Sequence, residues 1–514
     1  MTAVTAPANY RLYIGGNVSG QVAVGNNNIQ IGRVEGGVVY VARPGETATP
    51  RARPTPVWQQ PRRFRGFLDR RQEASTAATV LQSNLPVEFY GQSGIGKTAL
   101  LRHLAYHLPV DRFSDGVVYV RVQGKTLDDI LQNLFDAFYE SEIPLKATMT
   151  QLRHALGDKK ALILLDDVAV TRDDLEALLD VAPNCAFLLA TEDRRLYGDG
   201  RAVALKGLPS EEALALLERE LGRPLSEAER SGAQGLAAQL EGHPLQILRM
   251  ASLVRDGELS LTQLDGYRLA GAGQVTAQRV EALPERERRV VLGLAAVGGL
   301  PVSELHVAAL AGLPDASVAL QALAERGLVQ IQDQQVSLPG DVAAALQQEA
   351  DLAVHRTWAL ATFTQLAETQ AEALAADSSA IQHLLTWAVE SGRWSDALRL
   401  VRAVEGAVAL DGQWGAWKQL LQSGLRAAQA TGNRSAQAWA WHQLGTRALC
   451  LEQTEVARTA LVRALRLRQG LGEHAAAAIT RHNLEILLGP PSQNGKSSKK
   501  EPPDNGSQLR ADGW

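Results

Sequence analysis

The chain has 514 residues, enough for about three or four domains. Its 52 Lys and Arg residues against 56 Asp and Glu residues give a formal net charge of −4, whereas nucleic-acid binders usually carry a basic excess. Only two cysteines occur, Cys185 and Cys450, which excludes a disulfide framework and a cysteine-rich metal site and fits a reducing compartment. No apolar run approaches about 18 residues, and the start lacks a signal-peptide pattern. We therefore expect a cytoplasmic protein with no membrane partner.

The segment 1–42 is rich in Gly, Asn and Val and carries few charges. Within residues 17–32 (NVSGQVAVGNNNIQIG), apolar residues alternate on both sides of an Asn/Gly turn, which is a hairpin pattern. Low charge, absence of Pro and a run of Asn also favour cross-β stacking. A small self-packed hairpin and an amyloid-forming segment both remain open. Residues 43–63 contain five prolines and are interpreted as a semi-stiff linker.

Residues 64–206 alternate short apolar runs with helical patterns, which is typical of a parallel sheet buried on both faces. The expected strands are Val87–Tyr90, Val117–Val122, Ala161–Leu165, Ala186–Ala190 and Ala202–Leu205. We therefore predict an α/β P-loop NTPase core, a class indicated by the loop described next.

A phosphate-binding loop, GQSGIGKT, matches G-x-x-x-x-G-K-[ST] in full between the first of these strands and a helical pattern over 98–107. Its glycines let consecutive backbone amides point at an anion at a helix N-terminus. Lys97 is expected to reach the β- and γ-phosphates, and the Thr98 hydroxyl to bind Mg²⁺. The nucleotide-binding residues predicted here are Gly91, Gln92, Ser93, Gly94, Ile95, Gly96, Lys97 and Thr98.

Two further strand ends carry polar residues. Asp166 and Asp167 end the strand ALILLDDV, at the edge of an open α/β sheet where ligands bind. We predict that Asp166 holds Mg²⁺ and that Asp167 is the catalytic residue that polarises the attacking water. The strand Val117–Val122, which intervenes in the chain, indicates the P-loop class with an added strand between the two Walker strands. Arg194, after the next strand, could contact a γ-phosphate; a solvated turn is an equal alternative.

After residue 207 the pattern is helical almost to residue 488, apart from a strand-like stretch at Leu328–Leu338. In the last third, Gly392, Gly432 and Gly472 recur at an interval of 40, which predicts stacked helical hairpins. Seven of the nine tryptophans lie in the region from 358 to 441, where we expect them to fill a solenoid core rather than a ligand cage. Residues 489–514 are polar and are expected to be disordered.

Together these motifs resemble the STAND-type signalling ATPases of the NB-ARC class, over residues 64–346. FRG at 64–66 with Glu73, LLATEDR, GLPSEEAL and GHPL at 242–245 are similar to family motifs. The resemblance implies that Pro244 packs on the adenine and that Arg194 senses phosphate. The stretch VSLPGD at 336–341 lacks the family's histidine, so only Asp341 of that motif remains.

The resemblance also implies a domain order, given with the linker and tail as 1–42, 43–63, 64–206 (P-loop domain), 207–280 (helical subdomain), 281–346 (winged helix), 347–488 (TPR-like all-α repeats) and 489–514. A DNA role for the winged helix is disfavoured, because residues 301–350 carry one cation, Arg326, against six acidic residues. IQIG at 29–32 resembles the core of RHIM-like amyloid signalling motifs found in some bacterial STAND proteins.

The function implied is an ATP/ADP-binding signalling switch, such as one in a defence response, with Mg²⁺ as cofactor. Its repeats would bind an unknown ligand or protein. ATP would drive homo-oligomerisation, residues 14–36 would engage a separate effector protein, and slow ATP hydrolysis would reset the switch. Two alternatives stay open: an ATP-dependent transcription regulator with the same core, and a motor-type ATPase with rapid turnover.

Overall fold

The structure is a computed structural model. It describes residues 11–14, 39–42 and 50–488, apart from 65, 69, 110–111, 142–144, 199, 256, 258–259, 264–278, 350 and 452. The expectations for residues 17–32 and for the tail lie outside these residues. Within the segment 1–42, the backbone of β1 (Arg11–Ile14) pairs antiparallel with that of β2 (Val39–Ala42).

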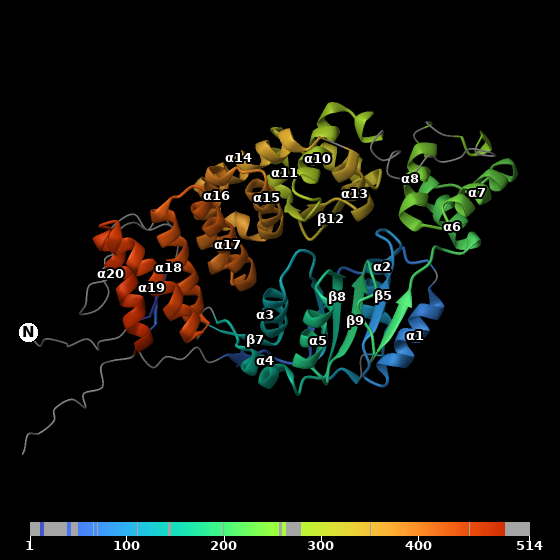
Figure 1. The fold of residues 1–514 in the computed structure, drawn as a ribbon. Coiled ribbons are helices and arrows are strands. Elements are labelled where there is room, and N and C mark those ends of the chain that lie inside the picture. Colours follow the sequence, from blue (N-terminus) through green and yellow to red (C-terminus); the bar gives the residue numbers. More distant parts are fainter. Residues whose placement is uncertain are drawn as a thin grey trace, which may run out of the picture.

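Six parallel strands form the central sheet, in the order β10-β5-β9-β8-β6-β4 (Figure 1). Their bounds are β4 (Val57–Gln59), β5 (Val87–Tyr90), β6 (Gly116–Arg121), β8 (Ala161–Val168), β9 (Ala186–Thr191) and β10 (Arg201–Ala204). The parallel α/β core is thereby confirmed, and the five strands expected from sequence all occur. The strand between β5 and β8 in the sheet is β9, whereas β6, which intervenes in the chain, pairs with the other edge of β8.

The interpretation of residues 43–63 as a linker along their whole length is wrong, because two short strands lie within this range. β4 lies at the edge of the sheet and pairs in parallel with the start of β6, and β3 (Arg51–Ala52) pairs with β7 (Tyr139–Glu140). Strands as short as these have no readable alternation, and prolines are tolerated around an edge strand. The proline spacing therefore concealed them.

Helices cover both faces of the sheet: α1 (Arg71–Leu81), α2 (Lys97–His107), α3 (Leu127–Phe138), α4 (Met149–Leu156) and α5 (Arg172–Val181). Alternate residues of β8 enter different cores. Leu162 and Leu164 join the cluster with α1 and α2, while Ile163 and Leu165 join the cluster with α3, α4 and α5. Because both faces are buried, the strand is apolar without interruption, as the sequence predicts.

Three helices follow the sheet and share a core of their own: α6 (Ser210–Leu221), α7 (Glu227–Gln239) and α8 (Pro244–Arg255), with the short 3-10 helix η2 (Leu261–Gln263). The next unit combines helices with a small three-stranded antiparallel sheet. Its elements are α10 (Glu285–Ala296), β11 (Val302–Ser303), α11 (Glu304–Ala311), α12 (Ser317–Glu325), β12 (Gln330–Gln332), β13 (Gln335–Ser337) and α13 (Gly340–Glu349). The hairpin β12–β13 lies inside the stretch 328–338 that was expected to be strand-like.

The C-terminal part consists of helices: α14 (Ala353–Gln370), the 3-10 helix η3 (Ala371–Asp377), α15 (Ser378–Glu390), α16 (Trp394–Leu410), α17 (Trp414–Ala430), α18 (Arg434–Cys450), α19 (Thr454–Gly470) and α20 (His474–Leu488). From α16 on, the helix starts are evenly spaced along the chain, and the interval of 40 read from the sequence is one hairpin. One continuous core runs from Val280 to Ala436, so the unit before the repeats and the first repeats pack as one body.

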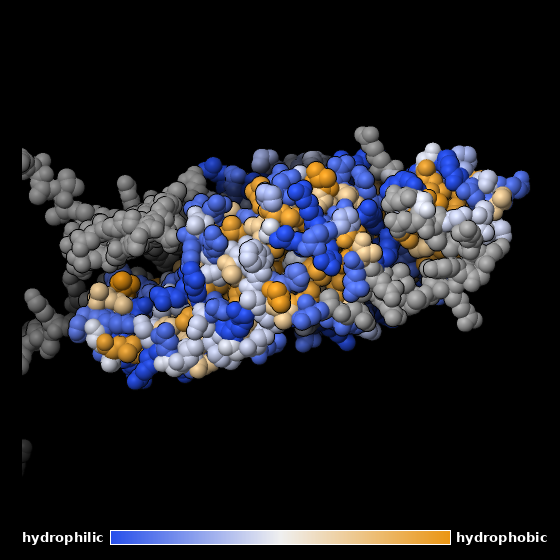
Figure 2. All heavy atoms as spheres, turned by 90° about the horizontal axis from the view of Figure 1, so that it is seen from above, coloured by the Kyte–Doolittle hydropathy of each residue, from blue (hydrophilic) through white to orange (hydrophobic). Residues whose placement is uncertain are grey.

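In Figure 1 the sheet lies below the repeats, with α6, α7 and α8 at one end and α18, α19 and α20 at the other. Figure 2 shows the face seen from above, where apolar side chains are interspersed with hydrophilic ones. None of the described helices combines the length and the apolar character that crossing a membrane would need.

Candidate nucleotide-binding site

The loop between β5 and α2 adopts the backbone that its glycines permit. Gly94 and Gly96 have φ values of +81° and +103°, which favour glycine over residues with a Cβ. Gly96 is also the residue before the first turn of α2, where no side chain caps the helix. The first amides of an α-helix have no acceptor within the helix, so this terminus is suited to an anion.

Lys97 is buried inside the loop. Its Nζ donates to the carbonyl oxygens of Gly91 at 2.6 Å and Gln92 at 3.0 Å, and the residue is 7% exposed. Burial lowers the pKa of the ammonium, while the carboxylates of Glu192 and Asp167 oppose that shift. A buried cation that donates to carbonyl oxygens fits the charge of a polyphosphate.

Asp166 is fully buried and accepts two hydrogen bonds. Thr98 Oγ1 donates to its Oδ1 at 3.0 Å, and the hydroxyl of Tyr119 donates to its Oδ2 at 2.7 Å. Burial and the neighbouring Asp167 raise the pKa of Asp166 to about 6, against the lowering effect of these two hydrogen bonds. A hydroxyl in contact with a carboxylate is the kind of oxygen pair that Mg²⁺ prefers, so the residues fit this metal.

The backbone of Asp167 departs from regular strand geometry. Its φ of +58° is uncommon for a residue other than glycine, and the pairing of β8 with β9 shifts register between Leu165 and Val168. The carboxylate forms an ion pair with Arg121 at 3.1 Å and lines the pocket. The predicted catalytic residue therefore faces the ligand space with a cation beside it.

Arg194 lies outside the pocket. Its side chain is exposed, its Nε donates to the Leu196 carbonyl at 3.2 Å, and its guanidinium lies 4.7 Å from the centre of the Tyr197 ring. Glu192 lines the pocket from the same segment instead. The structure thus agrees with the alternative of a solvated turn for Arg194.

Glu88, in the middle of β5, holds the segment after β9 in place. Its carboxylate accepts hydrogen bonds from Thr191 Oγ1 at 2.7 Å and from the backbone amides of Arg195 at 2.7 Å and Leu196 at 2.9 Å. Sequence analysis missed this residue. The signal was a glutamate inside an otherwise apolar buried strand, where a charge needs hydrogen-bond partners.

The start of α8 packs directly on the phosphate-binding loop. Pro244 lines the pocket, as predicted. His243 Nδ1 accepts from the Gln246 amide at 3.4 Å, so the neutral ring donates from Nε2 to the Ser93 carbonyl, at 3.0 Å. Burial lowers the pKa of His243, which favours this neutral form. The histidine at 243 was not predicted to have this role.

The unit that contains β12 and β13 closes the side of the pocket opposite α8. The backbone amide of Gly340, the first residue of α13, donates to Ser93 Oγ at 2.9 Å. Gln332 Nε2 donates to the hydroxyl of Tyr119 at 3.4 Å. Asp341 forms an ion pair with the buried Arg249 of α8, with a second hydrogen bond of 3.2 Å. Asp341 therefore joins two units of the chain rather than lining the pocket.

Together these elements enclose a pocket of about 430 Å³. Of the predicted residues, those that line it are Ser93, Gly94, Ile95, Gly96, Lys97, Thr98, Asp167 and Pro244. Gly91 and Gln92 contribute carbonyl oxygens to Lys97 behind it, and Asp166 lies beneath Thr98. Arg70 was also missed; its guanidinium donates to the Ile95 carbonyl at 3.0 Å.

Comparison with known proteins identifies a family whose domain matches part of the chain. Residues 78–224 match the family described as NB-ARC domain, which confirms the resemblance inferred from the motifs. Among solved structures, the chain is similar to a Signal Transduction ATPase with Numerous Domains (STAND) protein with a tetratricopeptide repeat sensor from Pyrococcus horikoshii. The identity is 16%, the match covers 84% of this chain and 69% of that chain, and the TM-score is 0.48. A DNA replication initiation factor matches at 14% identity over 72% of this chain and 96% of that chain, with a TM-score of 0.26. No curated protein matches the chain.

Proposed function

We propose that this chain, which carries an NB-ARC domain in residues 78–224, is an ATP/ADP-dependent signalling switch. The observation that carries the proposal is the position of Ser93. This residue of the phosphate-binding loop contacts His243, directly before α8, through its carbonyl oxygen and Gly340 of α13 through its hydroxyl. The loop that would hold phosphates therefore also holds the two units that follow the sheet, so a change of nucleotide can alter their packing.

Within this proposal, different residues of the chain bind the phosphates, hold the metal ion, orient the water and contact the base. The amides at the start of α2 bind the phosphates, and Lys97 offsets their charge from inside the loop. Thr98 and Asp166 would hold Mg²⁺, which supplies further charge neutralisation at the phosphates. Asp167, with Arg121 beside it, would orient the attacking water in a slow hydrolysis that resets the switch. Pro244 and Leu245 bound the apolar end of the pocket, where a base would lie.

Under this proposal, the arrangement would be the closed form of the switch. The carboxylate of Asp129 in α3 accepts from the amides of Gly415 at 2.8 Å and Ala416 at 3.0 Å, so the nucleotide-binding unit holds the first turn of α17. A ligand or protein bound by the repeats would compete with this docking. Release, exchange of ADP for ATP and assembly into a homo-oligomer would follow, which would gather the segments at residues 14–36 for an effector protein. We interpret residues 281–346 as a winged-helix-like unit that acts in closure rather than in DNA binding.

Nucleotide affinity tests the proposal. Lys97→Ala should weaken binding of a fluorescent ADP analogue to the full chain at least tenfold, because it removes the cation in the loop. Lys418→Ala, an exposed lysine on α17, is the matched control and should bind like the wild type. Equal affinity in both variants would contradict the switch. Native mass spectrometry with ADP and with a non-hydrolysable ATP analogue should then find a larger assembly with the analogue alone.

A further inference from the structure

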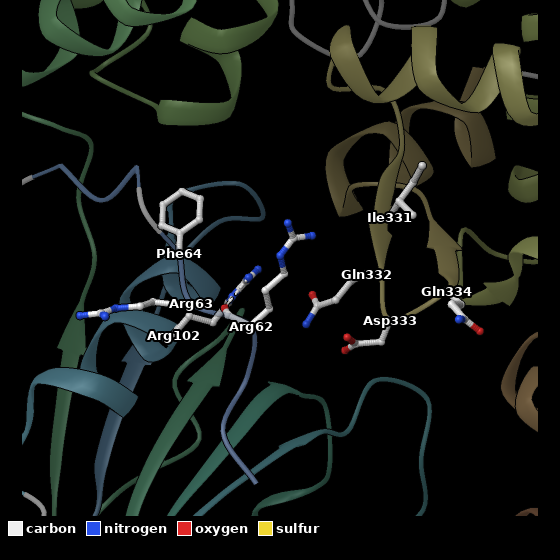
Figure 3. A pocket seen from close by; sticks show the side chains of 8 residues that line it. All are labelled: Arg62, Arg63, Phe64, Arg102, Ile331, Gln332, Asp333 and Gln334. Atoms are coloured by element: carbon white, nitrogen blue, oxygen red, sulfur yellow. Dashed lines mark hydrogen bonds between the residues drawn. The ribbon is translucent and has the colours of Figure 1, made fainter. Parts of the chain in front are cut away.

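A second hollow, of about 900 Å³, lies beside the nucleotide pocket (Figure 3). Arg62, Arg63 and Phe64, which precede α1, and Arg102 from α2 line one side. The hairpin β12–β13 lines the other side with residues 331–334. In Figure 3, Arg62 and Arg102 lie across open space from Gln332 and Asp333, whereas the side chains of Arg63 and Gln334 extend away from that space. The hollow thus lies between the nucleotide-binding unit and the unit that closes over it.

The charge of this hollow is strongly positive for its size. Three of its eight lining residues are arginines, and Asp333 is the single acidic one. Arg102 is held in place by hydrogen bonds from Nε and Nη2 to the Arg62 carbonyl, at 2.9 and 2.6 Å. Within the part of the chain that the structure describes, none of the three guanidinium groups pairs with a carboxylate. Arg62 and Arg63 are exposed, and the Arg63 guanidinium lies 5.4 Å from the centre of the Tyr106 ring, so the cluster presents cations to solvent.

The hollow adjoins the nucleotide pocket and shares some lining residues with it, but the two spaces differ in their arginines. Four residues line both spaces: Phe64, Arg102, Ile331 and Gln332. Arg62 and Arg63 line the second hollow and are not among the described residues that line the nucleotide pocket. These two cations can therefore be removed without altering the groups assigned to ATP or ADP.

The chemistry of the lining indicates the class of ligand. Guanidinium groups present planar, always-charged donors that match phosphate oxygens. Phe64 is 37% exposed and lies 5.8 Å from the Arg102 guanidinium, which gives an apolar surface next to the cations. Gln332 and Gln334 add amides from the hairpin. A volume of this order suits a small molecule rather than a single ion.

We propose that this hollow binds a second anionic ligand, a small molecule with two or more linked phosphate groups. Such a ligand would contact the arginines on one side and the β12–β13 hairpin on the other, and would so connect the two units. The site would add a second chemical input to the chain, separate from the P-loop. Binding at this hollow would depend on its own lining residues and not on ATP-driven assembly.

Isothermal titration of the full chain with inorganic tripolyphosphate tests this, with ADP and Mg²⁺ present in saturating amounts so that the P-loop is occupied. We expect one further mole of tripolyphosphate to bind per mole of chain. The double variant Arg62→Gln/Arg63→Gln should bind it at least tenfold more weakly and bind ADP as the wild type does. Arg434→Gln/Arg481→Gln removes two exposed arginines of the repeats and should change neither affinity.

Four results would overturn the proposal. The first is no second binding event, and the second is unchanged tripolyphosphate affinity in Arg62→Gln/Arg63→Gln. The third is tighter binding of a hexaglutamate peptide than of tripolyphosphate, which would assign the hollow to acidic peptides. If the double variant lost ADP affinity instead, the arginines would belong to the nucleotide site. Failure of the switch proposal is a separate result, because it is read from Lys97→Ala.

Discussion

The carboxylate of Asp129 accepts a hydrogen bond of 2.8 Å from the backbone amide of Gly415, a residue 286 positions later in the chain. Asp129 is 5% exposed, and it also accepts from Ala416 and from the Thr126 hydroxyl. A carboxylate that accepts first-turn amides normally caps its own helix; here α3 caps α17. This relationship fixes where the repeats dock on the nucleotide-binding unit.

Gly415→Ala should separate docking from helix stability. A Cβ at this position would lie 1.7 Å from Thr126 Oγ1 and 2.8 Å from Asp129 Oδ2, so the repeats must move away. Alanine favours a helix over glycine by up to about 1 kcal/mol, so α17 itself should not suffer. We expect a larger radius of gyration by small-angle X-ray scattering and faster amide exchange over residues 122–129.

The control is Gly406→Ala in α16, where an added Cβ meets nothing within 4 Å. This variant gains the same helix propensity and should raise the melting temperature without a change in scattering. If Gly415→Ala scattered like Gly406→Ala, the contact with Asp129 would not determine docking.

Asp166→Asn should stabilise the nucleotide-free protein at neutral pH. Because the folded pKa, about 6, exceeds the ordinary carboxyl value of 3.8, the stability that protonation confers is complete below about pH 4 and is lost as the pH rises through 6. Asparagine avoids this loss, by about 1–3 kcal/mol at pH 7.5. Urea denaturation should show a gain at pH 7.5 that shrinks toward pH 4.5. A gain independent of pH would contradict the assignment.

The strands and the phosphate-binding loop could be predicted because their signals are local. GQSGIGKT and ALILLDDV encode their own geometry through glycine spacing and apolar runs. Arg194 illustrates the limit: a motif places an arginine after a strand, but its direction depends on Tyr197 and on the anchor at Glu88. His243, Tyr119 and the cap at Gly415 depend on contacts between distant segments, which no short window of sequence contains.

Tyr119→Phe should weaken the coupling between Mg²⁺ and nucleotide. The hydroxyl of Tyr119 stabilises the ionised form of Asp166, so its loss should raise the pKa of that carboxyl further. We expect Mg²⁺ to enhance ATP binding less than in the wild type, with a larger deficit at pH 6.5 than at pH 8. Tyr139→Phe, whose hydroxyl bonds the Ala155 carbonyl far from the pocket, is the control. An identical Mg²⁺ dependence in both variants would argue against this role.

Asp341→Asn should loosen the contact between α8 and α13. It removes the partner of Arg249, whose side chain is 6% exposed, and leaves a buried cation without a counter-charge. Because Asp341 itself is 32% exposed, we expect a loss of about 1–3 kcal/mol in urea denaturation rather than the full cost of a buried pair. Glu285→Gln breaks the exposed pair with Arg288 and should change stability by less than about 0.5 kcal/mol. Equal effects would show that Arg249 finds another partner.

The even spacing of the helix starts from α16 onward determines how the length of the array can change. Each hairpin adds the same length of chain, so whole hairpins could be added or removed beyond α18 while α17 stays docked against α3. The length of the helical array could thus change while the contact between Asp129 and Gly415 stays in place.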